Sequence, residues 1–164
     1  MQDRYNVLFL GVGNSTRSII AESILNRKGF SNFTAYSAGS TPTQAIHPAA
    51  VRQLEIAGLP TAGLRTKSWA EFAIPGAPHF DFVFTLCDGT ADEVCPIWPG
   101  HPITGRWSVP DPTAADGSPE EMDHAFLDVF AILERRISLF LCLPRARLDD
   151  LAIKSETFQL GRPI

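Results

Sequence analysis

The sequence predicts an α/β protein built as a three-layer sandwich, with a four-stranded parallel sheet and helices on both of its faces. Short apolar runs alternate with stretches of helical periodicity, which is the pattern of parallel strands joined by crossover helices. The run at residues 7–10 is continuously apolar, as a strand buried on both faces requires. The chain has 164 residues, about the length of one domain. We assign residues 1–153 to a single domain and residues 154–164 to a C-terminal tail.

The expected elements are separated by glycines and capping residues. Gly11 closes the first strand, and Gly29 and Gly58 follow the first two helices as stop signals. Ser68 and Glu71 have capping-box spacing, which predicts a short helix there. In order, we expect strand 7–10, helix 18–28, strand 33–37, helix 47–57, a short helix from 68, strand 81–86, strand 103–109 and a long helix from 118.

The long C-terminal helix carries the clearest signals. Ser118 suits the N-cap, Pro119 suits the first helical position, and Glu121 completes a capping box. Apolar residues then recur at helical spacing and predict a stripe that faces the core. The stripe consists of Met122, Phe126, Val129, Phe130, Leu133, Ile137, Phe140 and Leu141. Cys142, in the apolar run at the end of this helix, is also expected in the core.

Charge and composition exclude several functional classes. Lys and Arg number 14 against 18 Asp and Glu, so the formal net charge is −4, whereas nucleic-acid binders usually carry a basic surplus. No apolar run approaches the roughly 20 residues of a membrane span, and the N-terminus lacks the pattern of a signal peptide. Three cysteines do not suggest a secreted disulfide framework. We therefore expect a cytoplasmic protein without nucleic-acid or membrane partners.

The loop at residues 11–18, GVGNSTRS, lies between the first strand and the first helix. Backbone N–H groups at a helix N-terminus and the helix dipole favour an anion at this place. Arg17 adds a permanently charged, planar group that can hold two oxygens at once. The alternative is an ordinary tight turn with a solvated arginine. Nucleotide-binding loops do not fit, because the Gly-Lys-Ser/Thr of a Walker loop and the third glycine of a dinucleotide loop are missing.

The segment NVLFLGVGNSTRSIIAE resembles the beginning of the low-molecular-weight protein tyrosine phosphatase family, which includes the thiol-dependent arsenate reductases. The loop of that family reads C-x5-R-S, and Asn14, Arg17 and Ser18 match it. The resemblance implies that the loop binds a tetrahedral oxyanion such as arsenate or phosphate. The implied oxyanion-binding residues are Val12, Gly13, Asn14, Ser15, Thr16, Arg17 and Ser18.

Gly11 stands where the resemblance places the nucleophilic cysteine of the family. A cysteine among these N–H donors and beside Arg17 would have a lowered pKa, about 3.5–7.5, and would attack the bound arsenic or phosphorus. Glycine has no side-chain atom that could do so. We therefore expect the chain to bind the anion without turnover, as an engineered knockout, a sequence variant or a natural non-enzyme.

Cys87 and Cys95 follow the third expected strand in the segment TLCDGTADEVCPIWPGHPITGRW. Two thiols on one loop can form a disulfide, and thiol exchange then transfers electrons. Two inert thiols, or a zinc site that includes His101, are the alternatives. The segment resembles the arsenate reductase branch of the family. That resemblance implies Cys87 as the resolving thiol, Cys95 as a second redox thiol, and an external reductant, either glutathione with glutaredoxin or thioredoxin.

Asp111 lies between Pro110 and Pro112, which fix the backbone on either side of it. A rigid acid at the carboxyl end of the sheet can protonate a leaving oxygen, whereas a turn aspartate is the alternative. The family has its general acid in an Asp-Pro at this place, so the resemblance implies that role for Asp111.

Two further segments resemble the family. Ser37 and Ser40 lie where, in the family, hydroxyl groups orient the loop asparagine, so both are implied as supporting residues. Arg65 and Lys67 could steer an anion, although a solvated pair of charges is the more ordinary interpretation. We expect no metal and no bound cofactor.

The resemblance as a whole implies a thiol-dependent arsenate reductase that is impaired by Gly11. One alternative is a phosphatase acting on phosphotyrosine or small phosphate esters. Another is a non-catalytic oxyanion-binding module.

Overall fold

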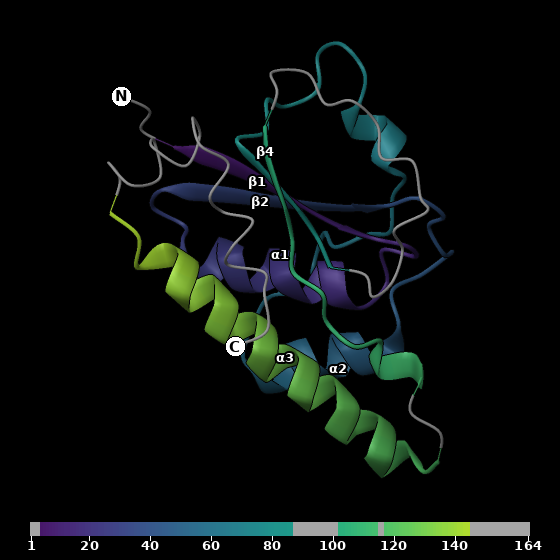
Figure 1. The fold of residues 1–164 in the computed structure, drawn as a ribbon. Helices are drawn as coiled ribbons and strands as arrows, with labels where there is room; N and C mark the ends of the chain where they lie inside the picture. The colour runs from purple at the N-terminus through teal and green to yellow at the C-terminus, as the bar shows by residue number, and fades with distance from the viewer. Residues whose placement is uncertain (1–3, 87–101, 115–116, 145–164) are drawn as a thin grey trace.

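The computed structural model describes residues 4–86, 102–114 and 117–144 (Figure 1). The expected strands and helices are present in the expected order. The elements are β1 (Tyr5–Gly11), α1 (Arg17–Lys28), β2 (Phe33–Gly39), α2 (Pro48–Ile56), the 3-10 helix η1 (Trp69–Phe72), β3 (Phe82–Thr85), β4 (Ile103–Arg106), the 3-10 helix η2 (Pro112–Ala114) and α3 (Pro119–Leu141). The short helix expected from Ser68 is thus a single 3-10 element, and β4 ends three residues earlier than expected.

All four strands run parallel, in the order β2-β1-β3-β4. β1 pairs with β2 from Tyr5 opposite Phe33 to Gly11 opposite Gly39, and it pairs with β3 on its other side. The connections therefore leave β1 first toward one edge of the sheet and then toward the other. Ligands of parallel sheets bind at the carboxyl ends of the strands, where this reversal occurs. The loop that follows Gly11 starts at that point.

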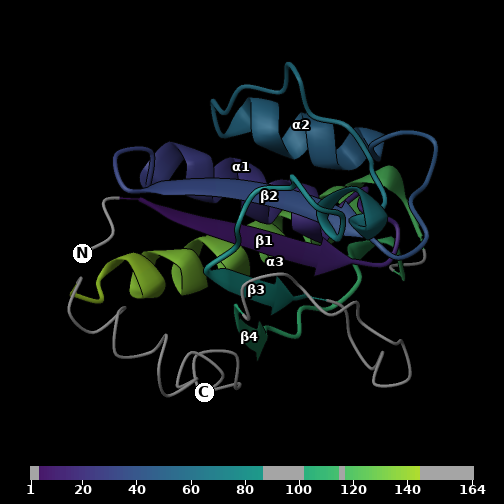
Figure 2. The ribbon, with the colours of Figure 1, turned by 90° about the horizontal axis from the view of Figure 1, so that it is seen from above.

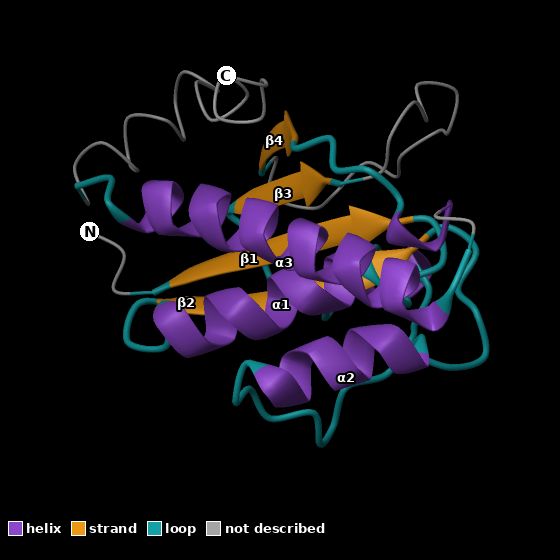
Figure 3. Cartoon of the chain, turned by 90° about the horizontal axis from the view of Figure 1, so that it is seen from below, coloured by secondary structure: helices purple, strands orange, loops and turns teal. Residues whose placement is uncertain are grey.

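The three α-helices pack together on one face of the sheet, as Figures 2 and 3 show. Their buried side chains form one hydrophobic core with alternate strand residues such as Val7 and Phe9. On the opposite face, Phe72 of η1 and Phe80 pack against Leu8 and Leu10. Three layers are therefore present, but the second face carries a 3-10 helix instead of an α-helix. Helix-breaking residues interrupt the chain there, namely Gly58, Pro60, Gly63, Pro75, Gly76 and Pro78.

An amide side chain forms hydrogen bonds with one residue at the edge of the sheet. β2 lies at the edge, so one side of its backbone has no strand partner. Asn26 of α1 fills this role at Ala35, because its Nδ2 donates to the Ala35 carbonyl at 3.1 Å and its Oδ1 accepts the Ala35 N–H at 2.8 Å. This contact fixes the position of α1 along the sheet, and α1 begins at the loop described below.

Helix α3 confirms its predicted start and most of its predicted stripe. Ser118 Oγ accepts the N–H of Glu121 at 3.2 Å, as the capping box requires. The fully buried residues of the stripe are Phe126, Val129, Phe130, Leu133, Ile137 and Phe140. The prediction for Cys142 is wrong: this residue is exposed, because it follows Phe140 by two positions, about 200° around the helix. Among the described residues, no helix has both the length and the apolar character needed to cross a bilayer.

Candidate oxyanion-binding site

Four carbonyl groups of the loop at residues 11–18 are bound by one neighbouring segment. Residues 40–47, which follow β2, donate their backbone N–H groups to the carbonyl oxygens of the loop. These hydrogen bonds run from Ser40 to Gly11 at 3.3 Å, from Thr41 to Val12 at 2.9 Å, from Thr43 to Gly13 at 3.0 Å and from His47 to Ser15 at 3.0 Å. The loop is thus held along its length through its acceptors.

The N–H groups of the same loop remain available. From Val12 to Ile19, no backbone N–H donates a hydrogen bond to another described residue. Thr16 occupies the N-cap of α1, yet its side chain makes no capping hydrogen bond, and the first turn of α1 contains no acidic residue. A set of open N–H donors at the positive end of a helix dipole favours an anion. The loop carbonyls thus bind residues 40–47, and the loop N–H groups are available to bind a ligand.

Asn14 gives the loop its sharp turn. Its φ is 52°, in the left-handed region, and it is the only non-glycine residue with a positive φ in the described part of the chain. Its side chain is 2% exposed, and both ends of the amide are bound. Nδ2 donates to Ser18 Oγ at 2.9 Å, and Oδ1 accepts the backbone N–H of Lys67 at 2.9 Å. These contacts fix the amide in one orientation and stabilise a strained backbone conformation.

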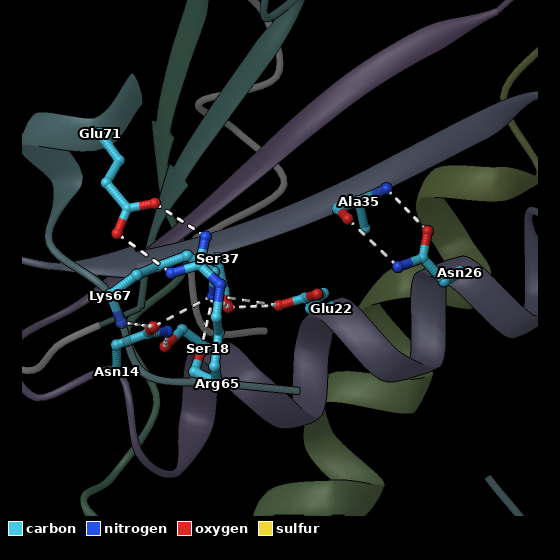
Figure 4. A network of polar contacts seen from close by, with 9 residues as sticks. All are labelled: Asn14, Ser18, Glu22, Asn26, Ala35, Ser37, Arg65, Lys67 and Glu71. Atoms are coloured by element: carbon cyan, nitrogen blue, oxygen red, sulfur yellow. Dashed lines mark hydrogen bonds and ion pairs between the residues drawn. The ribbon is translucent and has the colours of Figure 1, made fainter. Parts of the chain in front are cut away.

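Lys67 lies at the centre of a buried polar network that Figure 4 shows. Its Nζ donates to Asn14 Oδ1 at 3.3 Å and to the Arg65 carbonyl at 2.8 Å, and it lies 3.9 Å from Glu22 Oε1. Ser37 Oγ donates to the same carboxylate and lies 3.4 Å from Nζ. The expectation of a solvated charge is therefore wrong for Lys67, which is 9% exposed. Arg65 does lie at the surface, where it pairs with Glu71.

Burial works against both charges of the Glu22–Lys67 pair. Burial raises the pKa of Glu22, although the Ser37 hydrogen bond and the positive charge of Lys67 oppose this change. Burial also lowers the pKa of Lys67, and the negative charge of Glu22 opposes that change. Desolvation of a buried pair commonly offsets its mutual attraction. We therefore assign this pair the role of organising Asn14 and the loop, and little net stabilisation.

Gly39 allows β2 to approach the loop closely. A Cβ at residue 39 would lie 2.4 Å from the Val12 carbonyl oxygen and 3.0 Å from the Asn14 nitrogen. These neighbours are backbone atoms, which cannot rotate away. A glycine is required at this position if the loop is to keep its place.

Gly11 differs from Gly39 in this respect. A Cβ at residue 11 would have the Ser18 side chain as its nearest neighbour, with Oγ at 3.3 Å and Cβ at 3.7 Å. Its φ lies outside the left-handed region that favours glycine. The backbone at the end of β1 therefore has a conformation and a space that suit a residue with a small side chain.

Arg17 lies close enough to Asp111 for its positive charge to act on that carboxyl group. Arg17 Nη1 donates to the Val109 carbonyl at 2.9 Å, and its remaining N–H groups have no acceptor among the described residues. Asp111 Oδ1 accepts from the Thr113 backbone at 2.9 Å and from the Thr113 hydroxyl at 2.6 Å. Burial alone would raise the pKa of Asp111, but the Thr113 hydrogen bonds and the charges of Arg17 and His47 lower it overall. Asp111 is thus a carboxylate at neutral pH.

A second arginine holds the same segment. Arg136 of α3 donates from Nη1 to the Ser108 carbonyl at 2.9 Å, next to the carbonyl that Arg17 binds. Burial lowers the pKa of Arg136. Trp107, which precedes this segment, is fully buried and stacks on Phe84 with ring centroids 4.1 Å apart. The chain between β4 and Asp111 is therefore anchored at consecutive residues.

The family model of the low molecular weight phosphotyrosine protein phosphatases matches residues 6–152 of this chain. The chain belongs to this family. The match includes the loop, Lys67 and the segment that carries Asp111.

The curated relatives of this phosphatase-family chain include arsenate reductases. The chain is 32% identical over 135 residues to the arsenate reductase of Bacillus licheniformis, which covers 82% of this chain and 93% of that protein. It is 31% identical over 134 residues to the arsenate reductase of Shouchella clausii, with the same coverage of 82% and 93%.

Solved structures of both kinds of enzyme share the fold of this phosphatase-family chain. A thioredoxin-dependent arsenate reductase from Corynebacterium glutamicum superposes with a TM-score of 0.57 at 27% identity, over 83% of this chain and 63% of that one. The tyrosine phosphatase Wzb from Escherichia coli K30 superposes with a TM-score of 0.64 at 24% identity, over 85% of this chain and 96% of that one.

Ser18 and Lys67 donate to or accept from the Asn14 side chain in this family member, and Ser37 Oγ in turn accepts from the Lys67 ammonium at 3.4 Å. The backbone N–H of Ser40 binds the Gly11 carbonyl.

Cys87 and Cys95, with His101, lie outside the described residues. Within the described ranges, no group of three His, Cys, Asp or Glu side chains could hold a metal ion.

Sequence reasoning missed Glu22 and Arg136 altogether. Both are charged residues on helices, and a charge on a helix is usually solvated. One signal could have found Glu22, because it lies one turn after Ser18, on the side of α1 that faces the loop.

Proposed function

We propose that this chain binds a tetrahedral oxyanion in the loop at residues 11–18, and that its line of descent is that of the arsenate reductases. The observation that supports this most directly is the division of the loop backbone. Four carbonyl oxygens of the loop accept hydrogen bonds from residues 40–47, while the N–H groups from Val12 to Ile19 have no described acceptor. The unprotonated oxygens of an oxyanion accept hydrogen bonds and carry negative charge, so they complement such a donor set. The arsenate reductases among the relatives support arsenate as the anion.

Arg17 supplies charge to the bound anion. Its guanidinium keeps one hydrogen bond to Val109 and has further N–H groups for the anion oxygens. Asp111 lies close enough to Arg17 to have its pKa lowered by it. An arsenate bound beside Asp111 would raise that pKa again, because two neighbouring negative charges disfavour each other. Asp111 would then hold a proton and could pass it to a leaving oxygen.

The complete reaction needs a thiol that this chain lacks at Gly11. With a cysteine there, the thiolate would form a bond to arsenic while one As–O bond breaks and the oxygen leaves with the proton of Asp111. Cys87 would then attack the sulfur, form a disulfide and leave its bonding electrons on arsenic, which departs as arsenite. Cys95 would receive the disulfide. Thioredoxin, or glutathione with glutaredoxin, would supply the electrons that restore the thiols.

Titration calorimetry at low salt tests the anion site. We expect heat from arsenate, phosphate and sulfate with the native chain, and none with Arg17→Ala. Native protein that gives no heat with any of these anions would contradict the proposal. The variant Gly11→Cys tests the relation to the arsenate reductases, because it should gain arsenate-dependent oxidation of its thiols. Adding Cys87→Ser to this variant should stop the reaction once the thiolate of residue 11 has bonded to arsenic.

Two other functions remain distinguishable in the same assays. A phosphatase would show ester hydrolysis by Gly11→Cys with no arsenate-dependent oxidation of thiols. A non-catalytic oxyanion-binding module would bind the anions but gain neither activity with Gly11→Cys.

A further inference from the structure

We propose that the space above Gly11 is a binding site for a small external thiolate, with hydrosulfide as its smallest member, and that this thiolate converts arsenate held in the loop to a thioarsenate. The inference rests on the proposed oxyanion site and extends it to a second ligand. It assigns a reaction to the chain as it stands, without a cysteine at residue 11.

The space itself is defined by the atoms around Gly11. Among the described residues other than its chain neighbours, a Cβ there would meet only Ser18 within 4 Å, with Oγ at 3.3 Å as the nearest atom. The corresponding position at Gly39 is blocked by backbone at 2.4 Å. A side-chain atom bonded to residue 11 would therefore find room at the end of β1, whereas one bonded to residue 39 would not find room at the neighbouring end of β2. Gly11 is buried, so an occupant would be removed from bulk water.

A buried hydroxyl group is directed at this space. Ser18 is 1% exposed, and its Oγ accepts a hydrogen bond from Asn14 Nδ2 at 2.9 Å. The hydroxyl hydrogen has no acceptor among the described residues, although a serine hydroxyl is a donor as well as an acceptor. An anion at the position of the missing side chain would accept it. The hydrogen bond from Asn14 polarises this hydroxyl and makes it a stronger donor.

Charge selects a thiolate over a neutral small molecule. The open N–H groups that begin at Val12, the positive end of the α1 dipole and Arg17 all favour an anion near Gly11. Sulfur suits the site, because a thiolate is strongly nucleophilic and ionises near neutral pH. Size should limit the ligand, because the Ser18 side chain lies 3.3 Å from the position of a Cβ at residue 11. Hydrosulfide should therefore bind, and alkyl thiols should be excluded in proportion to their bulk.

The reaction balances without an oxidant or a reductant. Hydrosulfide attacks the arsenic of dihydrogen arsenate, so that an As–S bond forms while one As–O bond breaks. The leaving hydroxide takes the proton of Asp111 and departs as water, and the S–H proton returns to Asp111. The product is the monothioarsenate dianion, in which arsenic is still pentavalent. Asp111 has the same role here as in the proposed reductase reaction.

The native chain can be tested directly. Arsenate and sodium sulfide are incubated with it anaerobically at neutral pH, and thioarsenate is separated by anion-exchange chromatography and quantified by its arsenic. We expect formation at least about tenfold faster than without protein, because both reactants are held in contact. Gly11→Ala places a methyl group in the proposed site, and we expect its rate to fall to that of the protein-free solution. Ser18→Ala should lose most of the acceleration.

A size series gives a second measurement that needs no variant. Hydrosulfide should support product formation, and ethanethiol at the same thiolate concentration should support at least about tenfold less, because the site excludes the added carbons. Native protein that binds arsenate by calorimetry but does not accelerate the sulfide reaction would overturn this inference alone. Equal rates for Gly11→Ala and the native chain, or for the two thiols, would also overturn it. Absence of arsenate binding would instead overturn the proposed function.

Discussion

Lys67 contacts the Oδ1 atom of Asn14 twice, from its backbone N–H at 2.9 Å and from its ammonium at 3.3 Å. The two residues lie 53 positions apart in the sequence. Through this contact, the segment between α2 and η1 determines the orientation of the one loop residue with a left-handed backbone. The charges of Lys67 and Glu22 are therefore coupled to the shape of the loop at residues 11–18, although neither side chain belongs to the loop.

Lys67→Met should lower the free energy of unfolding by about 3 kcal/mol, because it leaves the buried Glu22 carboxylate without its cation. Urea denaturation at neutral pH measures this change. The affinity for phosphate should fall as well, since Asn14 loses a partner.

The double variant Lys67→Met with Glu22→Gln serves as the control. Removing both charges should recover part of the lost stability, because the uncompensated carboxylate is gone and the amide can still accept from Ser37. If the double variant is less stable than Lys67→Met, the two side chains do not form a coupled pair.

Gly39→Ala should lower stability by about 2–3 kcal/mol and weaken anion binding, because its methyl group would overlap the Val12 carbonyl. Thermal unfolding and calorimetry with phosphate measure the two effects. Gly11→Ala provides the comparison, since its methyl group meets a rotatable serine at 3.3 Å and should cost clearly less stability. Similar losses for both variants would contradict the assignment of Gly39 as the point of close approach.

Asp111→Asn should raise the affinity for sulfate about threefold to tenfold at neutral pH, because it removes a negative charge next to a bound dianion. The pKa of Asp111 is lowered in the free protein, so its carboxylate is charged there above the ordinary value of about 3.8, whereas a bound anion raises this pKa. The difference in affinity between the two proteins should therefore shrink as the pH falls and vanish below the pKa of the free protein. The Thr113 hydrogen bonds to this carboxylate also stabilise the folded protein. That contribution to the free energy of unfolding is present above a pH of about 3.8 and is lost as the pH falls through the lower folded pKa. Calorimetry of both proteins from neutral to acidic pH measures the difference. A difference that persists unchanged at low pH would contradict the assignment.

Arg136→Met should change stability by no more than about 1 kcal/mol, because removing a charge that burial disfavours offsets the lost hydrogen bond to Ser108. Its effect should appear at Asp111: the pH dependence of sulfate binding should weaken, since the segment carrying the carboxylate is less firmly held. Arg135→Met is a matched control on the exposed side of α3 and should leave this dependence intact. If both variants give the same profile, Arg136 has no positioning role.

Local signals in the sequence predicted most of the elements. Ser118 and Pro119 located the start of α3, and the spacing from Phe126 to Phe140 located its buried face. The same spacing excludes Cys142 from that face, so the incorrect assignment came from the apolar composition of its neighbours. The apolar runs and the glycines that follow them were enough to predict the strands of the parallel sheet. Each of these signals lies within a few consecutive residues, so one sequence displays it.

The support of the loop could not be predicted in this way. Lys67 lies in the polar stretch LRTKSW, which has the composition of an exposed turn. Its burial depends on Asn14, Glu22 and Ser37, which come from three separate parts of the chain. Arg136 likewise finds its acceptor on a loop 28 positions away. Contacts of this kind depend on the tertiary fold and leave no periodic or local pattern in one sequence.

The open position beside Ser18 also bears on the history of the protein. A site that loses its nucleophile often fills with larger neighbours, after which the ancestral residue no longer fits. Among the described residues outside its chain neighbours, only Ser18 lies within 4 Å of a Cβ at residue 11, and some glycine codons differ from a cysteine codon by one base. Under the proposed function, a change to cysteine at residue 11 would therefore need one base substitution and no rearrangement of the described backbone.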